Sequence, residues 1–178
     1  GDNSTPEWQE LVDLNINEDS GENIFSIDST WIMDEEQSIS QILFVVEANS
    51  DSMHLGANFN GSDLFLTSFE DNYFTTEPIN LTLTAFDGDY TDTTFVNVNI
   101  DPVNDDPVLI DIGDLITDED VPKIITLTAE DIDEDNLIYS AISEDTSLAY
   151  VEIIDNQLTM APALNWNGSL NISVEVSD

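Results

Sequence analysis

The stretch Thr93-Thr94-Phe95-Val96-Asn97-Val98-Asn99-Ile100 alternates apolar and polar residues, and Asp101-Pro102-Val103-Asn104-Asp105-Asp106-Pro107 follows it directly. A period of two is typical of a β-strand with one buried face, and Phe95 and the valines carry this pattern. The next segment combines two prolines with four oxygen-bearing side chains, which suits a stiff linker that binds a metal. We therefore expect the chain to be organised around this junction.

The sequence on the two sides of the junction is repeated. Residues 6–19 align with residues 107–120 without a gap, at an offset of 101 residues (6 to 107). Near the other end, residues 79–87 align with residues 170–178 at an offset of 91 residues (87 to 178). The second copy is therefore about ten residues shorter in its middle, and the chain is predicted to hold two homologous domains.

These domains are placed at residues 1–101 and 107–178, with a calcium-binding linker at 102–106. Strands are expected in the first copy near 7–16, 23–28, 40–47, 53–58, 63–67, 79–86 and 93–100, and in the second near 107–116, 123–129, 137–142, 148–153, 157–160 and 169–176. Short strands with no helical pattern predict an all-β chain of two tandem Greek-key β-sandwiches of immunoglobulin-like type. The second copy lacks a counterpart of 93–100, so either it is truncated or a strand from another molecule completes its sheet by β-augmentation.

The composition is extremely acidic: 39 Asp and Glu residues stand against one basic residue, Lys123, for a formal net charge of −38. Nucleic acid and anionic membrane are therefore poor partners, because phosphate binding depends on Lys and Arg. No apolar run reaches about 18 residues, so we expect no membrane insertion. There is no signal peptide at Gly1, and we expect an internal fragment or a processed product of a larger protein.

The chain contains no cysteine, which excludes disulfides and zinc–thiolate sites and leaves calcium as the candidate staple of an extracellular domain. Self-repulsion of so many carboxylates also favours bound cations. A halophilic surface, kept hydrated by acidic side chains, would account equally well for the overall charge. It would not account for acidic residues clustered at one pole.

Strands that alternate in direction collect the loops of a sandwich at two poles. Residues 17–19, residues 69–72 and the linker then lie at one pole of the first domain, while residues 131–135 and the terminal Asp178 lie at the facing pole of the second. Calcium takes 6–8 oxygen ligands and tolerates irregular geometry, so it resolves this concentration of negative charge. The candidate metal ligands are Glu18, Glu70, Asp101, Asn104, Asp105, Asp131, Asp133 and Asp178, whereas Asp19 and Asp135 could equally cap turns.

The linker resembles the Asp-x-Asn-Asp-Asn-x-Pro junction of cadherins, with one extra residue before Asn104 and with Asp106 in place of the last Asn. Phe69-Glu70, Asp131-x-Asp133 and Ala85-x-Asp87-Gly88 resemble further cadherin motifs. The second copy, with Asp118-Glu119-Asp120 and Asn165-Trp166-Asn167-Gly168, is similar to bacterial cadherin-like tandem repeats.

This resemblance implies calcium bound between successive domains, in long extracellular adhesins and in modules attached to secreted enzymes. Asp34-Glu35-Glu36 is a degenerate version of the paired-Asp motif, so a poorer site is expected at the far pole of the first domain.

We therefore expect an extracellular or cell-surface adhesion or structural module that calcium rigidifies at the interdomain junction. Its expected partners are neighbouring repeats or cell-surface and polysaccharide ligands, and it could form a homo-oligomer. The alternatives are a carbohydrate-binding module that stacks sugars on Trp8 or Trp166, and a subunit of a strand-exchanged extracellular filament. An enzyme is not expected, because the lone His54 has no Ser–His–Asp arrangement and the three tryptophans, including Trp31, suit the core of a sandwich.

Overall fold

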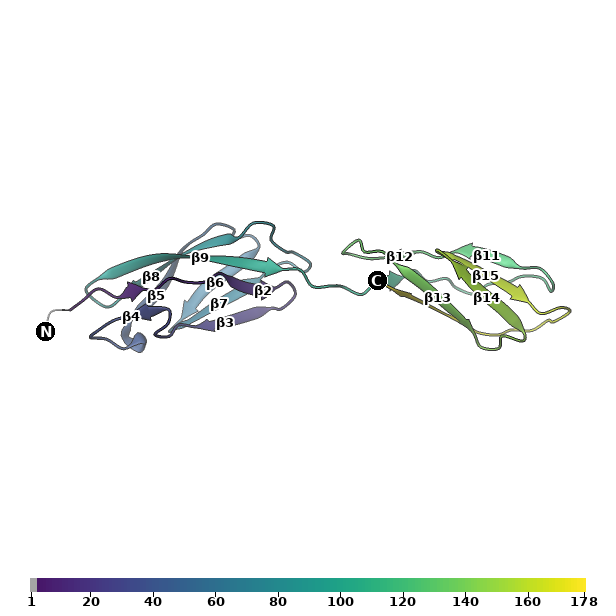
Figure 1. The fold of residues 1–178 in the computed structure, drawn as a ribbon, viewed down its shortest axis with the longest axis horizontal. Helices are drawn as coiled ribbons and strands as arrows, with labels where there is room; N and C mark the ends of the chain where they lie inside the picture. Colours follow the sequence, from purple (N-terminus) through teal and green to yellow (C-terminus); the bar gives the residue numbers. More distant parts are fainter. Residues whose placement is uncertain (1–2) are drawn as a thin grey trace. The chain divides into compact units, whose positions relative to one another are not determined.

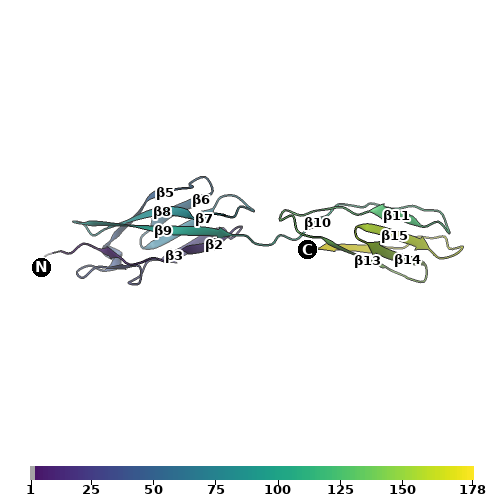
Figure 2. The ribbon, with the colours of Figure 1, turned by 45° about the horizontal axis from the view of Figure 1, so that its top comes forward.

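The chain is all-β in a computed structural model, which describes residues 3–178 (Figures 1 and 2). It divides into two compact units, of which the first runs to Val103 and the second comprises Asn104–Asp178. No helix among the described residues is long and apolar enough to cross a membrane. The predicted fold class, an all-β chain of tandem β-sandwiches, is confirmed.

The first unit is a sandwich of two main sheets. One sheet has the strand order β2-β9-β8-β5 and the other the order β3-β7-β6, while β1 pairs with β4. The strands are β1 (Glu7–Trp8), β2 (Leu14–Asn17), β3 (Glu22–Ser26), β4 (Ile32–Met33), β5 (Leu43–Asn49), β6 (Leu55–Asn60), β7 (Asp63–Ser68), β8 (Ile79–Phe86) and β9 (Thr91–Asp101), with a short 3₁₀ helix η1 (Ile39–Gln41) before β5.

Strand β9 holds the larger sheet of this unit together (Figure 1). It pairs with β8 in antiparallel fashion and with β2 in parallel fashion, so that Val98 lies opposite both Ile79 and Leu14. Val96, Val98 and Ile100 are buried, which is the alternation predicted from the sequence. Phe95 is an exception: it belongs to the opposite phase and is 72% exposed, so its assignment to the buried pattern was wrong.

The second unit has the same plan with fewer strands. Its strands are β10 (Val108–Leu109), β11 (Lys123–Thr126), β12 (Ala129–Glu130), β13 (Ile138–Ser143), β14 (Ala149–Ile154), β15 (Gln157–Pro162) and β16 (Ile172–Ser177). One sheet has the order β11-β15-β14, and the pairs β13-β16 and β10-β12 complete the unit. Its core is smaller than that of the first unit and centres on Leu127, Leu158 and Met160.

The predicted first strand of each copy is not continuous. In the first unit, 7–16 is divided into β1 and β2, because β1 pairs with β4 while β2 pairs with β9 of the large sheet. In the second unit only Val108–Leu109 of 107–116 is strand, since β10 pairs with β12 and no described strand lies beside residues 112–118. Strand β4 and helix η1 were not predicted.

Candidate metal centre

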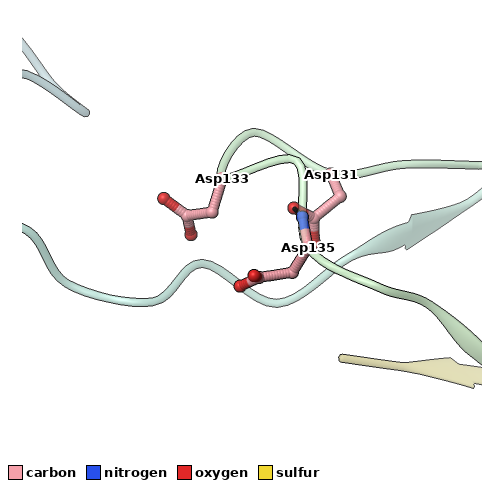
Figure 3. Close-up of side chains that lie close together, drawn as sticks. All are labelled: Asp131, Asp133 and Asp135. Atoms are coloured by element: carbon pink, nitrogen blue, oxygen red, sulfur yellow. Dashed lines mark hydrogen bonds between the residues drawn. The ribbon is translucent and has the colours of Figure 1, made fainter.

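Three carboxylates gather on the loop between β12 and β13 of the second unit. Asp131, Asp133 and Asp135 each present an oxygen within 4.8 Å of the others, and Figure 3 shows all three side chains on this loop. Among residues 3–178 this is the group of three acidic side chains close enough to share one cation. Asp131 and Asp133 are half-buried and Asp135 is exposed. Asp135, for which turn capping was an equal alternative, therefore adds its carboxylate to the cluster.

Hydrogen bonds from the backbone fix the shape of this loop. The backbone N–H of Asp135 donates to Asp131 Oδ1 at 3.0 Å, and the N–H of Asp105 donates to Asp133 Oδ2 at 2.7 Å. Glu134 adopts the left-handed conformation, with φ of 58°, which turns the chain between the acidic residues. The loop is thus ordered by bonds that engage one carboxylate oxygen of Asp131 and one of Asp133.

The second carboxylate oxygen of Asp131 indicates whether this loop suits a bound metal ion. Asp131 Oδ2 is buried and has no hydrogen-bond partner. A buried carboxylate oxygen without a partner is costly, and a cation is the group that would satisfy it. The all-oxygen donor set fits calcium, which accepts several carboxylates and backbone carbonyls at once.

Two bonded pairs of predicted ligands lie at the same pole of the second unit. Asn104 Nδ2 donates to Asp178 Oδ2 at 2.8 Å, which joins the segment before β10 to the end of β16. Asp105 is joined to Asp133 through the backbone bond described above. The structure therefore pairs Asn104 with Asp178 and Asp105 with Asp133.

In the first unit, residues 17–19 were predicted to lie at the same pole as the linker. Glu18 is the buried acidic residue of this segment, with 2% of its surface exposed. Its Oε1 accepts a hydrogen bond from the Val103 N–H at 2.8 Å, and its own N–H donates to the Asp101 carbonyl oxygen at 2.9 Å. Its Oε2 is buried without a hydrogen-bond partner. Glu18 is therefore bonded to the chain at the end of β9, and one of its carboxylate oxygens accepts no hydrogen bond.

Glu70 and Asp19 have different surroundings. Glu70 is exposed, and its Oε2 lies 3.8 Å from His54 Nε2. Asp19 Oδ1 accepts the Asn72 N–H at 3.1 Å, so this side chain caps the loop that carries Glu70. The role of Glu70 as a metal ligand remains a prediction.

His54 belongs to a polar cluster that the sequence analysis did not find. Its Nδ1 lies 2.8 Å from Asp51 Oδ2, and its ring stacks on Tyr73 with centroids 4.0 Å apart. The hydrogen bond from His54 holds the pKa of Asp51 below its ordinary value. The sequence signal for this cluster was the spacing of three residues between Asp51 and His54 in a turn. The cluster fixes His54 beside Glu70.

The opposite pole of the first unit repeats the pattern of bonds seen in the second. Asn3 Nδ2 donates to Asp87 Oδ2 at 3.1 Å, and the Ser4 N–H donates to Glu36 Oε2 at 3.1 Å. Asp34 Oδ2 is buried without a hydrogen-bond partner, as Asp131 Oδ2 is. Burial acts to raise the pKa of Asp87, but the backbone N–H groups of Tyr90 and Asp89 and the Asn3 amide hold it below its ordinary value.

Two tryptophans lie in the core of the first unit. Trp8 packs edge-to-face on Phe44 with centroids 5.7 Å apart, and its Nε1 donates to the Asp92 carbonyl oxygen at 3.2 Å. Trp31 is half-buried against the same core. Trp166 is half-buried in the second unit, with its ring over Gly168.

The comparisons with known proteins agree with this fold. A family model described as a cadherin-like domain matches residues 103–178. None of the curated proteins compared matches the sequence significantly.

Solved structures similar to this chain include cadherin ectodomains. The human Desmocollin-1 ectodomain is 12% identical over 98% of this chain and 37% of its own, with a TM-score of 0.54. Human Protocadherin-24 EC1-2 is 16% identical over 97% of this chain and 86% of its own, also with a TM-score of 0.54. The Protocadherin GammaB4 extracellular domain is 19% identical over 96% of this chain and 31% of its own, with a TM-score of 0.51. Residues 103–178 thus form a cadherin-like domain, in a chain that has the fold of cadherin ectodomain repeats.

Proposed function

We propose that this chain is an extracellular adhesion or structural module in which calcium, bound at the junction between the two units, stiffens the linker. The observation that carries the proposal is the buried oxygen Asp131 Oδ2, which has no hydrogen bond and belongs to a cluster of three carboxylates. The setting outside the cell is inferred from the fold shared with ectodomains.

The negative charge of the three clustered carboxylates must be neutralised by a cation from solution. Lys123 is the one basic residue of the chain, and its Nζ donates to the Ile116 carbonyl oxygen at 2.7 Å. Like charges held close together in a partly buried site repel strongly without a counter-ion. Calcium is the best candidate, because magnesium demands a regular octahedron and usually keeps several waters.

The linker connects acidic groups of both units through the backbone. Glu18 accepts the N–H of Val103 within the first unit, and Asp133 accepts the N–H of Asp105 within the second. Asp105 follows Val103 by two residues, and two residues of extended chain span at most about 7 Å, so the two bonded N–H groups are close along the backbone. Calcium ligated by these carboxylates would therefore restrict the backbone of residues 103–105, which is how binding would stiffen the junction.

The test is a comparison of the chain in calcium, in magnesium and in chelator. If each site binds in the 10⁻⁴–10⁻³ M range of extracellular modules, ~10 mM calcium stabilises the bound form by about 1.4–2.7 kcal/mol per site. We expect a higher melting temperature, and a narrower distribution of overall dimensions in small-angle scattering, with calcium than with chelator. An unchanged melting temperature together with unchanged scattering would refute the proposal.

A further inference from the structure

The one histidine of the chain, His54, is held rigidly in the turn between β5 and β6. Its Nδ1 lies 2.9 Å from Asp51 Oδ1 and 2.8 Å from Asp51 Oδ2. Its ring lies nearly parallel to that of Tyr73, with an interplanar angle of 7°, and the Tyr73 hydroxyl donates to Asp51 Oδ2 at 3.2 Å. Two neighbours that are bonded to each other therefore fix both the position and the orientation of the imidazole.

The contact with Asp51 also determines which ring nitrogen is open. An ionised carboxylate only accepts hydrogen bonds, so in the neutral ring Nδ1 carries the hydrogen and Nε2 carries the lone pair. Nε2 lies 3.8 Å from Glu70 Oε2, which is too far for a hydrogen bond. Asp51 thus acts on His54 as carboxylates act on metal-binding histidines, whose second nitrogen they orient.

Two contacts hold the segment that carries Glu70 beside His54. The Phe69 N–H donates to the His54 carbonyl oxygen at 2.9 Å. The Phe69 ring lies against Gly56, where a Cβ atom would come within 2.5 Å of Phe69 Cζ, so a residue without a side chain is needed here. Glu70 is the next residue, and its side chain is 58% exposed. Its backbone is therefore fixed, while its carboxylate is free to adjust to a ligand.

We propose that His54 Nε2 and a carboxylate oxygen of Glu70 bind a divalent transition-metal ion such as zinc, and that Asp51 positions the imidazole. Zinc forms bonds of about 2.0–2.2 Å to histidine nitrogen and carboxylate oxygen, so an ion between two atoms 3.8 Å apart reaches both. Closing the N–Zn–O angle to the tetrahedral value moves the Glu70 oxygen by about 0.4 Å. Water fills the remaining positions, as it does in open zinc sites.

The donor atoms distinguish this ion from the calcium proposed above. Imidazole nitrogen suits zinc, copper and nickel, whereas calcium and magnesium take oxygen ligands. The negative field of a chain with a formal net charge of −38 raises the local concentration of any divalent cation. The competing account is a protonated His54 that forms ion pairs with Asp51 and Glu70, and it predicts a different response to zinc.

Nuclear magnetic resonance of the imidazole nitrogens tests the proposal, because a chain with one histidine gives one set of signals. The titration uses zinc at about pH 8, where a free histidine is neutral. Calcium at about 10 mM is present throughout, so that it occupies carboxylate groups that would otherwise take up zinc. We expect the Nε2 resonance to shift on zinc addition while Nδ1 stays protonated. Isothermal titration calorimetry on the same samples gives the affinity.

Matched variants locate the ligands. Glu70→Gln removes the carboxylate at an exposed position and is expected to weaken zinc binding at least about tenfold. Glu77→Gln makes the same change at an exposed residue of the same loop and is expected to leave the affinity within about twofold. His54→Phe keeps a ring beside Tyr73 and is expected to abolish the rise in melting temperature that zinc gives the parent.

Asp51→Asn tests the positioning role. The amide oxygen can still accept the Nδ1 hydrogen, but the negative charge is lost, so the zinc affinity is expected to fall about 10–100-fold. The Nε2 shift at zinc saturation should equal that of the parent, because Asp51 is not itself a ligand. A different shift at saturation would show that Asp51 coordinates the ion and would overturn the positioning role.

The proposal is overturned if about 1 mM zinc leaves the Nε2 resonance unchanged. It is also overturned if both ring nitrogens stay protonated, since His54 is then an ion-pair partner of Asp51 and Glu70. An Nε2 shift with equal zinc affinities in Glu70→Gln and Glu77→Gln would mean an adventitious ion only, bound to the histidine alone. None of these results bears on calcium binding at the Asp131 cluster, which is measured separately.

Discussion

Asn104 Nδ2 donates a hydrogen bond to Asp178 Oδ2 at 2.8 Å, and so joins the entry of the second unit to the end of its strand β16. The first unit repeats this bond at the equivalent positions, where Asn3 Nδ2 donates to Asp87 Oδ2 at 3.1 Å. In both units, an Asp with a buried, unpartnered oxygen follows in the next acidic loop: Asp131 in one and Asp34 in the other. The acidic poles of the two units are therefore built on the same set of bonds.

Replacing Asp133 by Asn is expected to weaken calcium binding. The variant keeps an oxygen that can accept the Asp105 N–H, so the loop should retain its shape while losing one negative charge. We expect a decrease in calcium affinity of about tenfold or more, which is about 1.4 kcal/mol or more. Titration calorimetry measures it, with Asp155→Asn in the exposed β14–β15 turn as a control for loss of charge alone. Equal affinities in the two variants would remove this cluster from the calcium site.

Replacing Glu18 by Gln is expected to affect the thermal stability of the calcium-free chain differently from the stability that the chain gains when calcium binds. Glu18 is buried, and its Oε2 has no hydrogen-bond partner, so its charge is unfavourable when no cation is present. The variant is therefore expected to melt at the same temperature as the parent, or higher, in chelator, and to gain less on addition of calcium. Thermal denaturation in both conditions tests this. A calcium-induced gain equal to that of the parent would show that Glu18 is not a ligand.

The sequence predicts most of the fold, because strand alternation is a local property. The alternation in β8 and β9 marks Leu81, Leu83, Val96 and Val98 as core residues, and all four are buried. The path of the first strand could not be predicted in this way. Its division into β1 and β2 depends on pairing with β4 and β9, which are far away in the sequence.

The candidate site is predictable as far as the loops that carry it. The bonds between Asn104 and Asp178, and between Asp105 and Asp133, join segments that only the folded topology brings together. The position of Glu70 beside His54 could not be predicted, because the direction of an exposed side chain depends on neighbours such as this one. The phase of Phe95 was ambiguous, since the residue is apolar and adjoins the buried Val96.

Truncation of the equivalent core residues is expected to affect the two units unequally. Leu83→Ala removes a completely buried side chain from the first unit, which destabilises a core by about 2–5 kcal/mol. Val174→Ala in the second unit should cost less, because Val174 is only half-buried. Hydrogen exchange resolved for each unit measures both effects. Equal losses would contradict the incomplete packing of the second core.

The turn that follows β3 should show a specific dependence on pH. Asp28 Oδ1 accepts hydrogen bonds from Thr30 Oγ1 at 2.6 Å and from the Thr30 N–H at 2.8 Å, and these bonds hold the pKa of Asp28 below its ordinary value. A lowered folded-state pKa contributes stability above the unfolded pKa of about 3.9, and that contribution is lost as the pH falls through the folded-state pKa. Thr30→Val removes the hydroxyl donor, so it is expected to raise the pKa of Asp28 and to destabilise the first unit at pH 7 more than at pH 2. Carbon-detected NMR titration of the Asp28 carboxyl measures the pKa, and Ser29→Ala is the neighbouring control. If the pKa does not move in the Thr30 variant, the hydroxyl bond is not its cause.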